Sequence, residues 1–555
     1  MRFLSNLFVF LGASKGPLQP SSVDEIGRER AARVEAEAAL ARLDLPAALA
    51  SLQEWEKHAS EPLTLALLGH VLKTMGKPDR ALDVLEGGLR THRDDIVLLE
   101  TLASLYEYTQ DAALEYRCRK RRMMLSGCEI GHVTGAMKAL LGIKSRDGLP
   151  AADIRLIRAL FKQREAMAQP EECVRFAELL FKVEGAQNDA IELMTRHQPA
   201  PPGMQDRTFK RASVASVPPK SGVLRKSGSG EQAVQLLNLT QARVLSGLHW
   251  APCLPDANFL LDVFMTVKPV YARERASSPM LLLSASQAHL RLNMTAPQVV
   301  EGPCVLLGGG AATNYYHFLH EHLSRLAVLD EFGVNHSQMR YVVGQGLQPF
   351  QREYLDLLGI REDQLVEMPD AGVLEFATLL APVPLGRGGN FTSSLIATWA
   401  RSRLVSACRA VPGGRRKLFL SRAGTTRRRI VNEAELFGVF EAYGYEFISP
   451  EELSVRDQII LFSQATHIAG SGGAALTNML FMPPGGQVLM LNNRYIPSHA
   501  RNLYFEPMSR ACGHSFTILS GEPVSFPTSR AIDADVRIDL DATRALLEKS
   551  QEQVR

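Results

Sequence analysis

The sequence has few cysteines, and no two of them have a spacing that indicates a metal site. The seven cysteines are scattered along 555 residues without a Cys-x-x-Cys pair. A disulfide framework is typical of small secreted domains with an even, closely spaced set of cysteines. We therefore expect buried, reduced thiols, no metal held by the protein, and a reducing compartment such as the cytoplasm.

Long apolar runs are absent as well. No run reaches the roughly 18–20 residues that cross a bilayer as a helix. The apolar stretch Leu7–Leu11 near the start follows a single basic residue, which is short and weakly basic for a secretion signal. We favour a cytoplasmic location, with at most peripheral contact at the inner face of the membrane. Secretion and an interfacial membrane foothold are the alternatives.

Charge of one sign is not in excess over the whole chain. Lys and Arg number 62 and Asp and Glu number 59, which gives a net charge of +3. This balance excludes a protein that is basic throughout, so an anion site must come from a local cluster. Hydrophobic residues at 46% and charged residues at 22% are ordinary globular values, and the length suffices for several domains.

Residues 22–197 are predicted to form a helical repeat domain. Apolar residues recur there at helical spacing, and Leu49, Leu82 and Leu114 close similar short phrases that are 33 and 32 residues apart. Small residues such as Gly69 fall where paired helices would approach closely. A period near 34 residues resembles tetratricopeptide repeats. These helices could bind a protein partner or act as a spacer, and the sequence leaves both open.

Residues 198–232 have the composition of a linker. They are rich in Pro, Gly and Ser, with scattered basic residues and few apolar ones. Such basic residues most simply keep a linker solvated, although they could also touch an anionic surface.

From residue 233 the pattern changes to short strands alternating with helices. This alternation predicts βαβ crossovers and a parallel sheet, whose ligands bind beyond the carboxyl ends of the strands. We divide this α/β body into a lobe of residues 233–410, a second lobe of residues 411–530, and a C-terminal helix and tail, residues 531–555. The clearest strands are expected at Lys417–Ser421, Tyr445–Ser449, Thr466–Gly470 and Gln487–Leu491.

A basic stretch follows the first of these strands. The residues from Arg409 to Arg429 include eight basic side chains and no acidic one. Guanidinium groups match phosphate oxygens with forked pairs of donors. We expect Arg422 and Arg427, which lie next to the strand end, to bind phosphate. A solvated surface loop is the alternative.

A glycine-rich turn leads from the third strand into the next predicted helix, residues 474–481. The turn reads Gly470-Ser471-Gly-Gly473-Ala474 and the matching segment ends at Asn478. Backbone N–H groups at such a helix start can hold an anion. The glycine spacing differs from that of the dinucleotide-binding fingerprint, and no acidic residue follows about 20 positions later, which disfavours a dehydrogenase.

A polar stripe lies on a predicted helix further upstream. Asn314, His317, Glu321 and Arg325 are spaced by 3, 4 and 4 residues, which places them on one helix face. A His and a Glu together can transfer protons. A network that only stabilises the helix is the alternative, and zinc is disfavoured because the order is not His-Glu-x-x-His.

These three segments resemble glycosyltransferase family 61, a group that includes capsular-polysaccharide biosynthesis proteins. The resemblance extends from about Pro303 to Leu491 and has its motifs in the family's order. This chain departs from the family pattern at Ser324, where the family has Pro, and at Gly472, where the family has His. The second departure leaves the donor contact or the choice of sugar open. The matching segments are Asn314–Leu326, Leu420–Glu433 and Gly470–Asn478.

The resemblance implies a GT-B-like body of two Rossmann-type lobes that transfers a sugar, with inversion, from a nucleotide sugar to a glycan or another hydroxyl acceptor in surface or capsular polysaccharide biosynthesis. It implies either Glu321 or His317 as the base. The acceptor would approach the lobe that carries the helix, so Asn314 and Arg325 are its expected supports. The residues implied to hold the donor diphosphate are Arg422, Arg427, Gly470, Ser471, Gly473, Ala474 and Asn478.

No tightly bound cofactor is expected, and a requirement for a divalent metal stays open. The string Asp533-Ala-Asp535 is interpreted as loop or cap residues rather than a metal site, and Asp541 as a helix cap. An inactive scaffold built on the repeats is the alternative to an enzyme, favoured by Gly472. Binding of nucleic acid is disfavoured because the only aromatic residue of the basic stretch is Phe419, which a strand would bury, so a platform for base stacking is missing.

Overall fold

The structure is a computed structural model. It describes residues 23–552 apart from 43, 57–60, 110, 144–149, 201, 203, 213–221, 227–233, 246–249, 255–258, 262–279, 285, 294–296, 370–372, 388–390, 412, 494–503 and 526–533.

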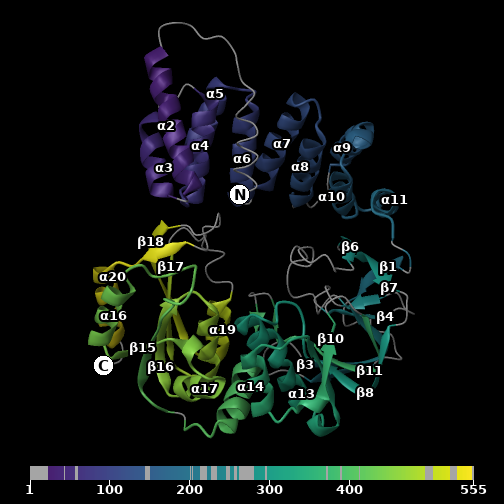
Figure 1. The fold of residues 1–555 in the computed structure, drawn as a ribbon, viewed down its shortest axis with the longest axis vertical. Coiled ribbons are helices and arrows are strands. Elements are labelled where there is room, and N and C mark those ends of the chain that lie inside the picture. The colour runs from purple at the N-terminus through teal and green to yellow at the C-terminus, as the bar shows by residue number, and fades with distance from the viewer. Residues whose placement is uncertain are drawn as a thin grey trace.

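The first part of the chain folds as a row of paired helices, as predicted (Figure 1). Its helices are α2 (Val23–Ala41), α3 (Leu45–Leu52), α4 (Pro62–Thr74), α5 (Pro78–Thr91), α6 (Ile96–Thr109), α7 (Ala112–Leu125), α8 (Ile130–Gly142), α9 (Ala151–Arg164), α10 (Pro170–Leu180) and α11 (Gln187–His197). None of the helices that the structure describes is long and apolar enough to cross a membrane.

The recurring phrases of this region are helix starts. Asp44 caps α3 by accepting a hydrogen bond from the backbone N–H of Ala47 at 3.0 Å, and Asp111 caps α7 in the same way from Leu114 at 3.0 Å. Proline occupies the first turn of α3, α4 and α5, where its missing N–H costs no helical hydrogen bond. The recurring phrases therefore coincide with the starts of α3, α5 and α7, where an Asp cap, an early proline or both favour the first turn.

Gly69 lets α4 and α5 pack closely. A Cβ atom at this position would lie 2.7 Å from Cγ of Leu85, which is fully buried on α5. The absent side chain is what brings the two helix backbones together, as expected from the sequence.

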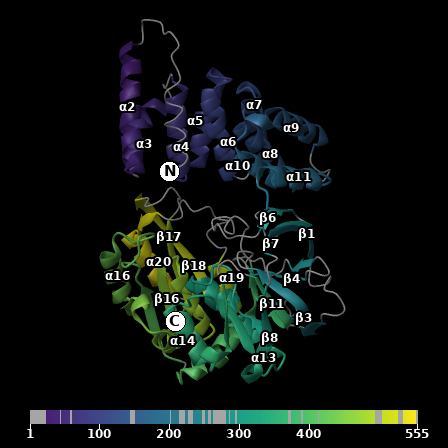
Figure 2. The same cartoon turned by 45° about the vertical axis from the view of Figure 1, so that its right-hand side comes forward.

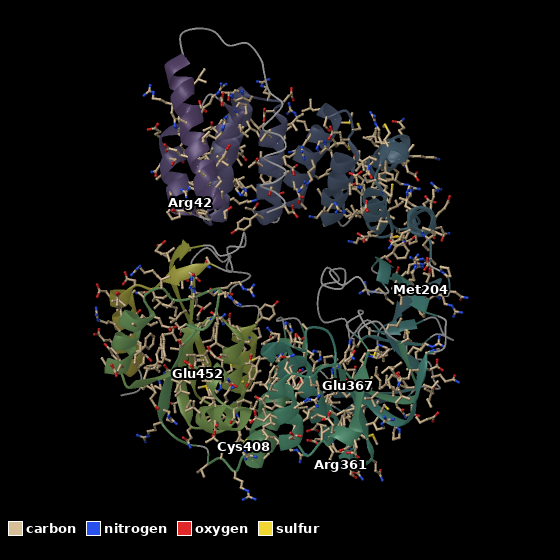
Figure 3. All side chains as sticks on the ribbon, viewed as in Figure 1. Arg42, Met204, Arg361, Glu367, Cys408 and Glu452 are labelled. Carbon is tan, nitrogen blue, oxygen red and sulfur yellow. The ribbon has the colours of Figure 1, made fainter. Side chains whose placement is uncertain are left out.

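The helical row rests on the α/β body near both of its ends. Ala534, which is 2% exposed, belongs to the apolar cluster of the first helices. Leu282, on strand β6 (Met280–Leu283), belongs to the cluster of α8 to α11, and β6 contacts α10. Figure 2 shows the row from a second direction, above both parts of the body.

The body contains two large sheets. The first has eleven strands, in the order β10-β9-β8-β11-β3-β4-β5-β1-β7-β6, with β2 paired to β3. The four strands β8, β9, β10 and β11 are parallel to one another. β3 continues the sheet and is antiparallel to β11. The lobe expected to be Rossmann-type is therefore a mixed sheet. Its bounds are β1 (Met204–Ala212), β2 (Gly222–Lys226), β3 (Val234–Leu245), β4 (Pro252–Leu254), β5 (Phe259–Leu261), β6, β7 (Gln287–Asn293), β8 (Gln298–Leu306), β9 (Arg340–Gly344), β10 (Leu365–Met368) and β11 (Val373–Pro382).

The prediction of a linker over residues 198–232 is wrong for β1 and β2, because both strands belong to the first sheet. β1 pairs antiparallel with β7, and only Phe209 among its described side chains is buried. Asp206 accepts hydrogen bonds from Arg291 of β7 at 2.8 and 2.9 Å. A strand held by backbone pairing and an ion pair needs few apolar residues, so its composition resembled that of a linker.

The second sheet has the order β15-β14-β16-β17-β18-β19. Its first five strands are parallel, as predicted, and β19 is antiparallel to β18. The strand order reverses between β14 and β16, so the chain leaves these neighbours in opposite directions, which opens a crevice at their carboxyl ends. The strands are β14 (Arg416–Leu420), β15 (Tyr445–Ile448), β16 (Ala465–Ser471), β17 (Gln487–Asn493), β18 (Ser515–Ser525) and β19 (Asp535–Arg537).

Helices join the two sheets through a shared core. One apolar cluster includes Val305 and Val343 of the first sheet and Leu418 and Ile468 of the second. The helices and short helical segments of this part are α12 (Tyr315–His317), the π-helix η8 (Phe318–Leu323), α13 (Arg325–Glu331), η9 (His336–Gln338), α14 (Pro349–Leu357), η10 (Glu362–Gln364), α15 (Ser394–Trp399), η11 (Ala400–Val405), α16 (Glu433–Ala442), η12 (Pro450–Glu452), α17 (Val455–Ser463), η13 (Ala474–Phe481), α19 (Phe505–Cys512) and α20 (Leu540–Glu552). The small hairpin strands β12 (Gly386–Arg387) and β13 (Phe391–Thr392) complete it.

The close packing at Gly69 generates a stability prediction. Gly69→Ala should lower the free energy of unfolding by about 1–3 kcal/mol, because the new methyl group would overlap Leu85. Gly87→Ala is the matched control on α5, where the nearest atom to the new Cβ is Arg90 Nη2 at 3.7 Å. It should gain up to about 1 kcal/mol from helix propensity. Urea unfolding followed by circular dichroism measures the free energy of unfolding of both variants. An equal increase in stability in the two variants would contradict the packing argument.

Candidate functional site

The loops that follow β14 and β16 form the candidate anion site at the reversal of strand order. Ser421 and Arg422 follow β14 directly, and Gly472 and Gly473 follow β16. A Cβ atom at Gly473 would overlap the guanidinium group of Arg422, so the two predicted segments meet side chain against backbone. The structure therefore confirms that Arg422 and the glycine turn lie next to each other.

Three arginines cluster at this point. Burial, and then the positive charges of Arg428 and Arg427, lower the pKa of Arg422 to about 10, which leaves the group protonated at neutral pH. Its Nε atom is buried without a hydrogen-bond partner among the described residues. Arg428 donates from Nη1 to the carbonyl of Gly472 at 3.0 Å. An anion bound here would relieve the mutual repulsion of the guanidinium groups.

Three other basic residues of the stretch have structural partners. Arg416 forms an ion pair with Glu446, Lys417 donates to the carbonyl of Tyr443 at 3.0 Å, and Arg429 donates to Asp535. Arg427 and Arg428 lie close enough to Arg422 to lower its pKa through their charges, after burial, and we call these three residues the arginine cluster.

Two buried or partly buried carboxylates hold the ends of the loop that carries this cluster. Glu433 accepts hydrogen bonds from Ser421 Oγ at 2.7 Å and from the backbone N–H of Arg422 at 3.1 Å. Asp535, with 0% exposure, accepts from the backbone N–H of Arg429 at 2.9 Å and from its side chain at 3.0 and 2.6 Å. Asp533 lies outside the described residues. No group of three His, Cys, Asp or Glu side chains suited to a metal occurs among the residues that were described.

The predicted helix after the glycine turn is a 3₁₀-helix, η13, and the residues of the turn have separate tasks. Gly470 packs against Leu420, because a Cβ there would lie 2.9 Å from Leu420 Cβ. Ser471 donates from Oγ to the carbonyl of Arg428 at 2.9 Å. Ala474 begins η13 and is partly buried. Gly473 is thus the turn residue whose missing side chain leaves room for the Arg422 guanidinium group.

Asn478 does not line this site. Its side chain is fully buried, accepts a hydrogen bond from Tyr315 Oη at 2.6 Å and donates to Gln458 Oε1 at 3.0 Å. Tyr315 Oη also lies 2.7 Å from Tyr354 Oη. Residues from α12, α14, α17 and η13 therefore form one buried hydrogen-bond network, which ties the two lobes together beside the anion site.

The polar stripe predicted on one helix is divided in the structure. α12 gives way at Phe318 to the π-helix η8, and α13 begins at Arg325. A π-turn widens the helix and often marks a functional position. Asn314 caps α12, accepting from the backbone N–H of Tyr316 at 3.0 Å. Asn314 therefore has a local structural role, and the expected contact with an acceptor stays a prediction.

His317 and Glu321 meet as predicted. His317 Nδ1 and Glu321 Oε2 are 3.0 Å apart, and the side chains are 21% and 0% exposed, respectively. Burial opposes ionisation of Glu321, yet the hydrogen bond from His317 and the nearby histidine charges lower the pKa of its carboxyl overall. An ionised Glu321 accepts the Nδ1 proton, which leaves Nε2 as the nitrogen of His317 that can take a proton.

Arg325 lies beneath the helix rather than beside the pair. It is 1% exposed and donates from Nη1 to the carbonyls of Leu306 at 3.2 Å and of Gly308 at 2.7 Å. These carbonyls end strand β8. Arg325 therefore fixes the helix to the end of β8, and an acceptor cannot reach its buried side chain.

Two further histidines of η8 are buried. His320 Nε2 lies 2.9 Å from Thr392 Oγ1, and His322 donates from Nε2 to the carbonyl of Gly310 at 2.9 Å. Burial lowers the pKa of His320 to about 4 and that of His322 to about 3. Both are neutral at physiological pH and hold the π-helix in place.

Several important residues were not singled out by sequence reasoning. Glu433 holds the start of the loop that carries the arginine cluster, and the side chain of Asn432 exchanges two hydrogen bonds with the backbone of Ile538. Tyr315 and Gln458 act over long sequence separations that no local period reveals. Asp539, not Asp541, caps α20 by accepting from the backbone N–H of Ala542 at 2.8 Å.

Residues 315–489 match the family model Glycosyltransferase 61. This match confirms the resemblance that the motifs indicated, and it supports glycosyltransferase activity in general. It includes His317, Glu321, the arginine cluster and the glycine turn. The helical region and Asp535 lie outside it.

The comparisons with curated proteins and with solved structures add no evidence on the activity. The search of curated proteins found no match. Among solved structures, MamA from Desulfovibrio magneticus RS-1 (residues 41 to the end) is 15% identical, with 31% of this chain and 93% of that chain covered and a TM-score of 0.26. A crystal structure of MamA is 10% identical, with 29% and 91% covered and a TM-score of 0.25.

The buried network between the lobes generates a second stability prediction. Tyr315→Phe should lower the free energy of unfolding by about 1–3 kcal/mol, because Asn478 would keep a buried acceptor without its donor. Tyr443→Phe is the control, since Tyr443 Oη makes only an exposed contact of 3.3 Å to Glu548. Equilibrium unfolding in urea measures the two variants. Equal stability of Tyr315→Phe and the native protein would contradict the network.

The buried histidines predict a dependence of stability on pH. The unfolded chain binds a proton at His320 below pH 6.5, whereas the folded state does so only near pH 4. The free energy of unfolding should therefore fall as the pH drops from about 6.5 to about 4, by up to about 3 kcal/mol for this group. His320→Gln should reduce this fall when urea unfolding is compared between pH 7 and pH 4. An unchanged slope would rule out His320 as a contributor.

Proposed function

We propose that the α/β body transfers a sugar, with inversion, from a nucleotide sugar to a hydroxyl group of a glycan or similar acceptor. The observation that carries this proposal is the arginine cluster at the reversal of strand order, joined through η13 to the helix that bears His317 and Glu321. The two sheets are then the two lobes of a GT-B-like enzyme. Its proposed setting is surface or capsular polysaccharide synthesis in the cytoplasm.

The donor diphosphate would bind between the arginine cluster and the glycine turn. Forked guanidinium donors suit its oxygens, and the absence of a side chain at Gly473 leaves the backbone open beside Arg422. When the bond between the anomeric carbon and the diphosphate oxygen breaks, negative charge grows on the leaving group. Positive charge held there beforehand stabilises this transition state.

The proton of the acceptor hydroxyl would pass to His317. The accessible side chain of the pair is His317, because Glu321 is completely buried. Nε2 of His317 takes the proton as the acceptor oxygen attacks the anomeric carbon, and Glu321 holds the ring orientation and stabilises the imidazolium that forms. Of the two candidate bases that the sequence left open, the greater exposure of His317 therefore favours His317.

The helical repeats would bind a protein partner, because stacked helix pairs of this kind form extended surfaces suited to binding. The donor itself can be identified by thermal shift with a panel of nucleotide sugars, because a ligand that binds only the folded state raises its melting temperature. If no nucleotide sugar or nucleoside diphosphate binds, the inactive scaffold suggested by Gly472 is the better reading.

The base assignment is tested by substitution. His317→Ala should lower kcat by about 10²–10⁴, the usual contribution of a general base. Glu321→Gln should lower kcat at least about tenfold, because the neutral amide no longer stabilises the imidazolium. Transfer from the donor found in the screen is measured after circular dichroism has shown that each variant folds.

Glu331→Gln is the matched control for these variants. It changes an exposed glutamate at the end of α13, ten positions from Glu321, and should leave kcat near the native value. Full activity in both His317→Ala and Glu321→Gln would overturn the assignment of the base.

A further inference from the structure

The loop that carries the arginine cluster must hold like charges together before any ligand arrives. Arg422, Arg427 and Arg428 repel one another, and burial, followed by the charges of Arg428 and Arg427, lowers the pKa of Arg422. The loop therefore needs fixed anchors at both ends. Glu433 provides the first, through Ser421 and the backbone of Arg422.

The second anchor comes from a segment far along the chain. Asp535 accepts hydrogen bonds from both the backbone and the side chain of Arg429. The backbone N–H of Val536 donates to the carbonyl of Arg429 at 2.9 Å, and the N–H of Val431 donates to the carbonyl of Val536 at 2.9 Å. The loop end is thereby paired like a short piece of sheet.

These bonds act on a residue with an unusual backbone. Arg428 has φ 57°, in the left-handed region that is unfavourable for a side chain other than glycine. Its carbonyl accepts from Ser471, and the next residue is bound to Asp535. This conformation persists because contacts on both sides hold it, and it directs the Arg428 guanidinium to the carbonyl of Gly472.

We propose that Asp535 is a positioning residue for the donor diphosphate, which sets the arginine cluster in its binding geometry through Arg429 and the strained backbone of Arg428. The inference rests on the proposed function, since it assigns this residue to the donor site. Asp535 touches neither the diphosphate nor the reacting atoms. It lies outside the residues that match the family model.

Electrostatics alone predicts the opposite effect of removing this carboxylate. A negative charge near an anion site weakens anion binding, so Asp535→Asn should tighten it if charge were all that mattered. If Asp535 positions the loop, Asp535→Asn should weaken binding instead, because Arg428 is released from its geometry. The sign of the change therefore separates the two roles.

The test measures dissociation constants of UDP, GDP and inorganic pyrophosphate by calorimetry in the full-length protein, together with KM and kcat for the donor. Asp535→Asn should raise the dissociation constant of the tightest of these probes, and KM, by about tenfold, as misplaced binding groups do, while kcat stays within about twofold. Asp206→Asn is the matched control, because Asp206 forms the same kind of pair with Arg291 in the other sheet. It should bind the probes like the native protein.

A second pair of variants covers the case in which Asp535→Asn does not fold. Arg429→Lys keeps the charge but loses the forked contact with Asp535, and it should also weaken binding. Arg416→Lys is its control, since Arg416 makes a comparable pair with Glu446 at the opposite end of β14. It should leave binding unchanged.

The outcomes separate the inference from the function beneath it. Unchanged or tighter binding in Asp535→Asn, or equal weakening in either control, would overturn the positioning role while the proposed function stands. Arg422→Ala serves as the reference for the donor site itself. If the native protein binds none of the three probes and transfers no sugar, the proposed function fails and the inference fails with it.

Discussion

Repulsion among three guanidinium groups is the constraint on which the candidate site depends. Arg422, Arg427 and Arg428 lie where the strand order of the second sheet reverses, and nothing in their own chemistry keeps them together. The surrounding structure does so with two carboxylates, Glu433 and Asp535, and with carbonyl and hydroxyl groups of the glycine turn. These contacts hold the proposed anion site together at the expense of local strain, which is visible in the left-handed backbone of Arg428.

The second constraint is rigidity between the lobes. Tyr315 lies two residues before His317 in the sequence. Its hydroxyl donates a hydrogen bond to Asn478, which belongs to the other lobe. The histidine that is proposed to take the proton and the turn that is proposed to hold the leaving group are therefore tied by one buried network. Such a network fixes distances that a transfer reaction needs, because reacting groups must be aligned before the chemical step.

Sequence patterns predicted those parts of the site that depend on the period of one helix or on the alternation of strands and helices. The helical period brought His317 to Glu321, and the alternation of strands and helices placed Arg422 beside the glycine turn. The same period also placed Arg325 on the stripe, and there it failed: Arg325 is buried and binds the end of β8. A helical spacing fixes which side chains share a face, but not whether that face is turned to solvent.

The remaining contacts were beyond reach because they join distant residues. Arg429 and Asp535 are 106 positions apart, and Tyr315 and Asn478 are 163 apart. No periodicity relates such pairs. Composition misled at β1 for a related reason, since the ion pair between Asp206 and Arg291 supplies what apolar residues usually supply.

The segment Ala534–Val536 connects the helical region to this site, although both lie outside the family match. Ala534 packs among the first helices, Asp535 binds Arg429, and Val536 pairs with the backbone on either side of Ile430. Three successive residues thus contact the helical row, the arginine side chain and the loop backbone. Any force that shifts the first helices against the body acts on Ala534, and the residue beside it holds the arginine cluster. The contact of Ala534 with the first helices therefore lies next in the sequence to the carboxylate that holds the proposed anion site.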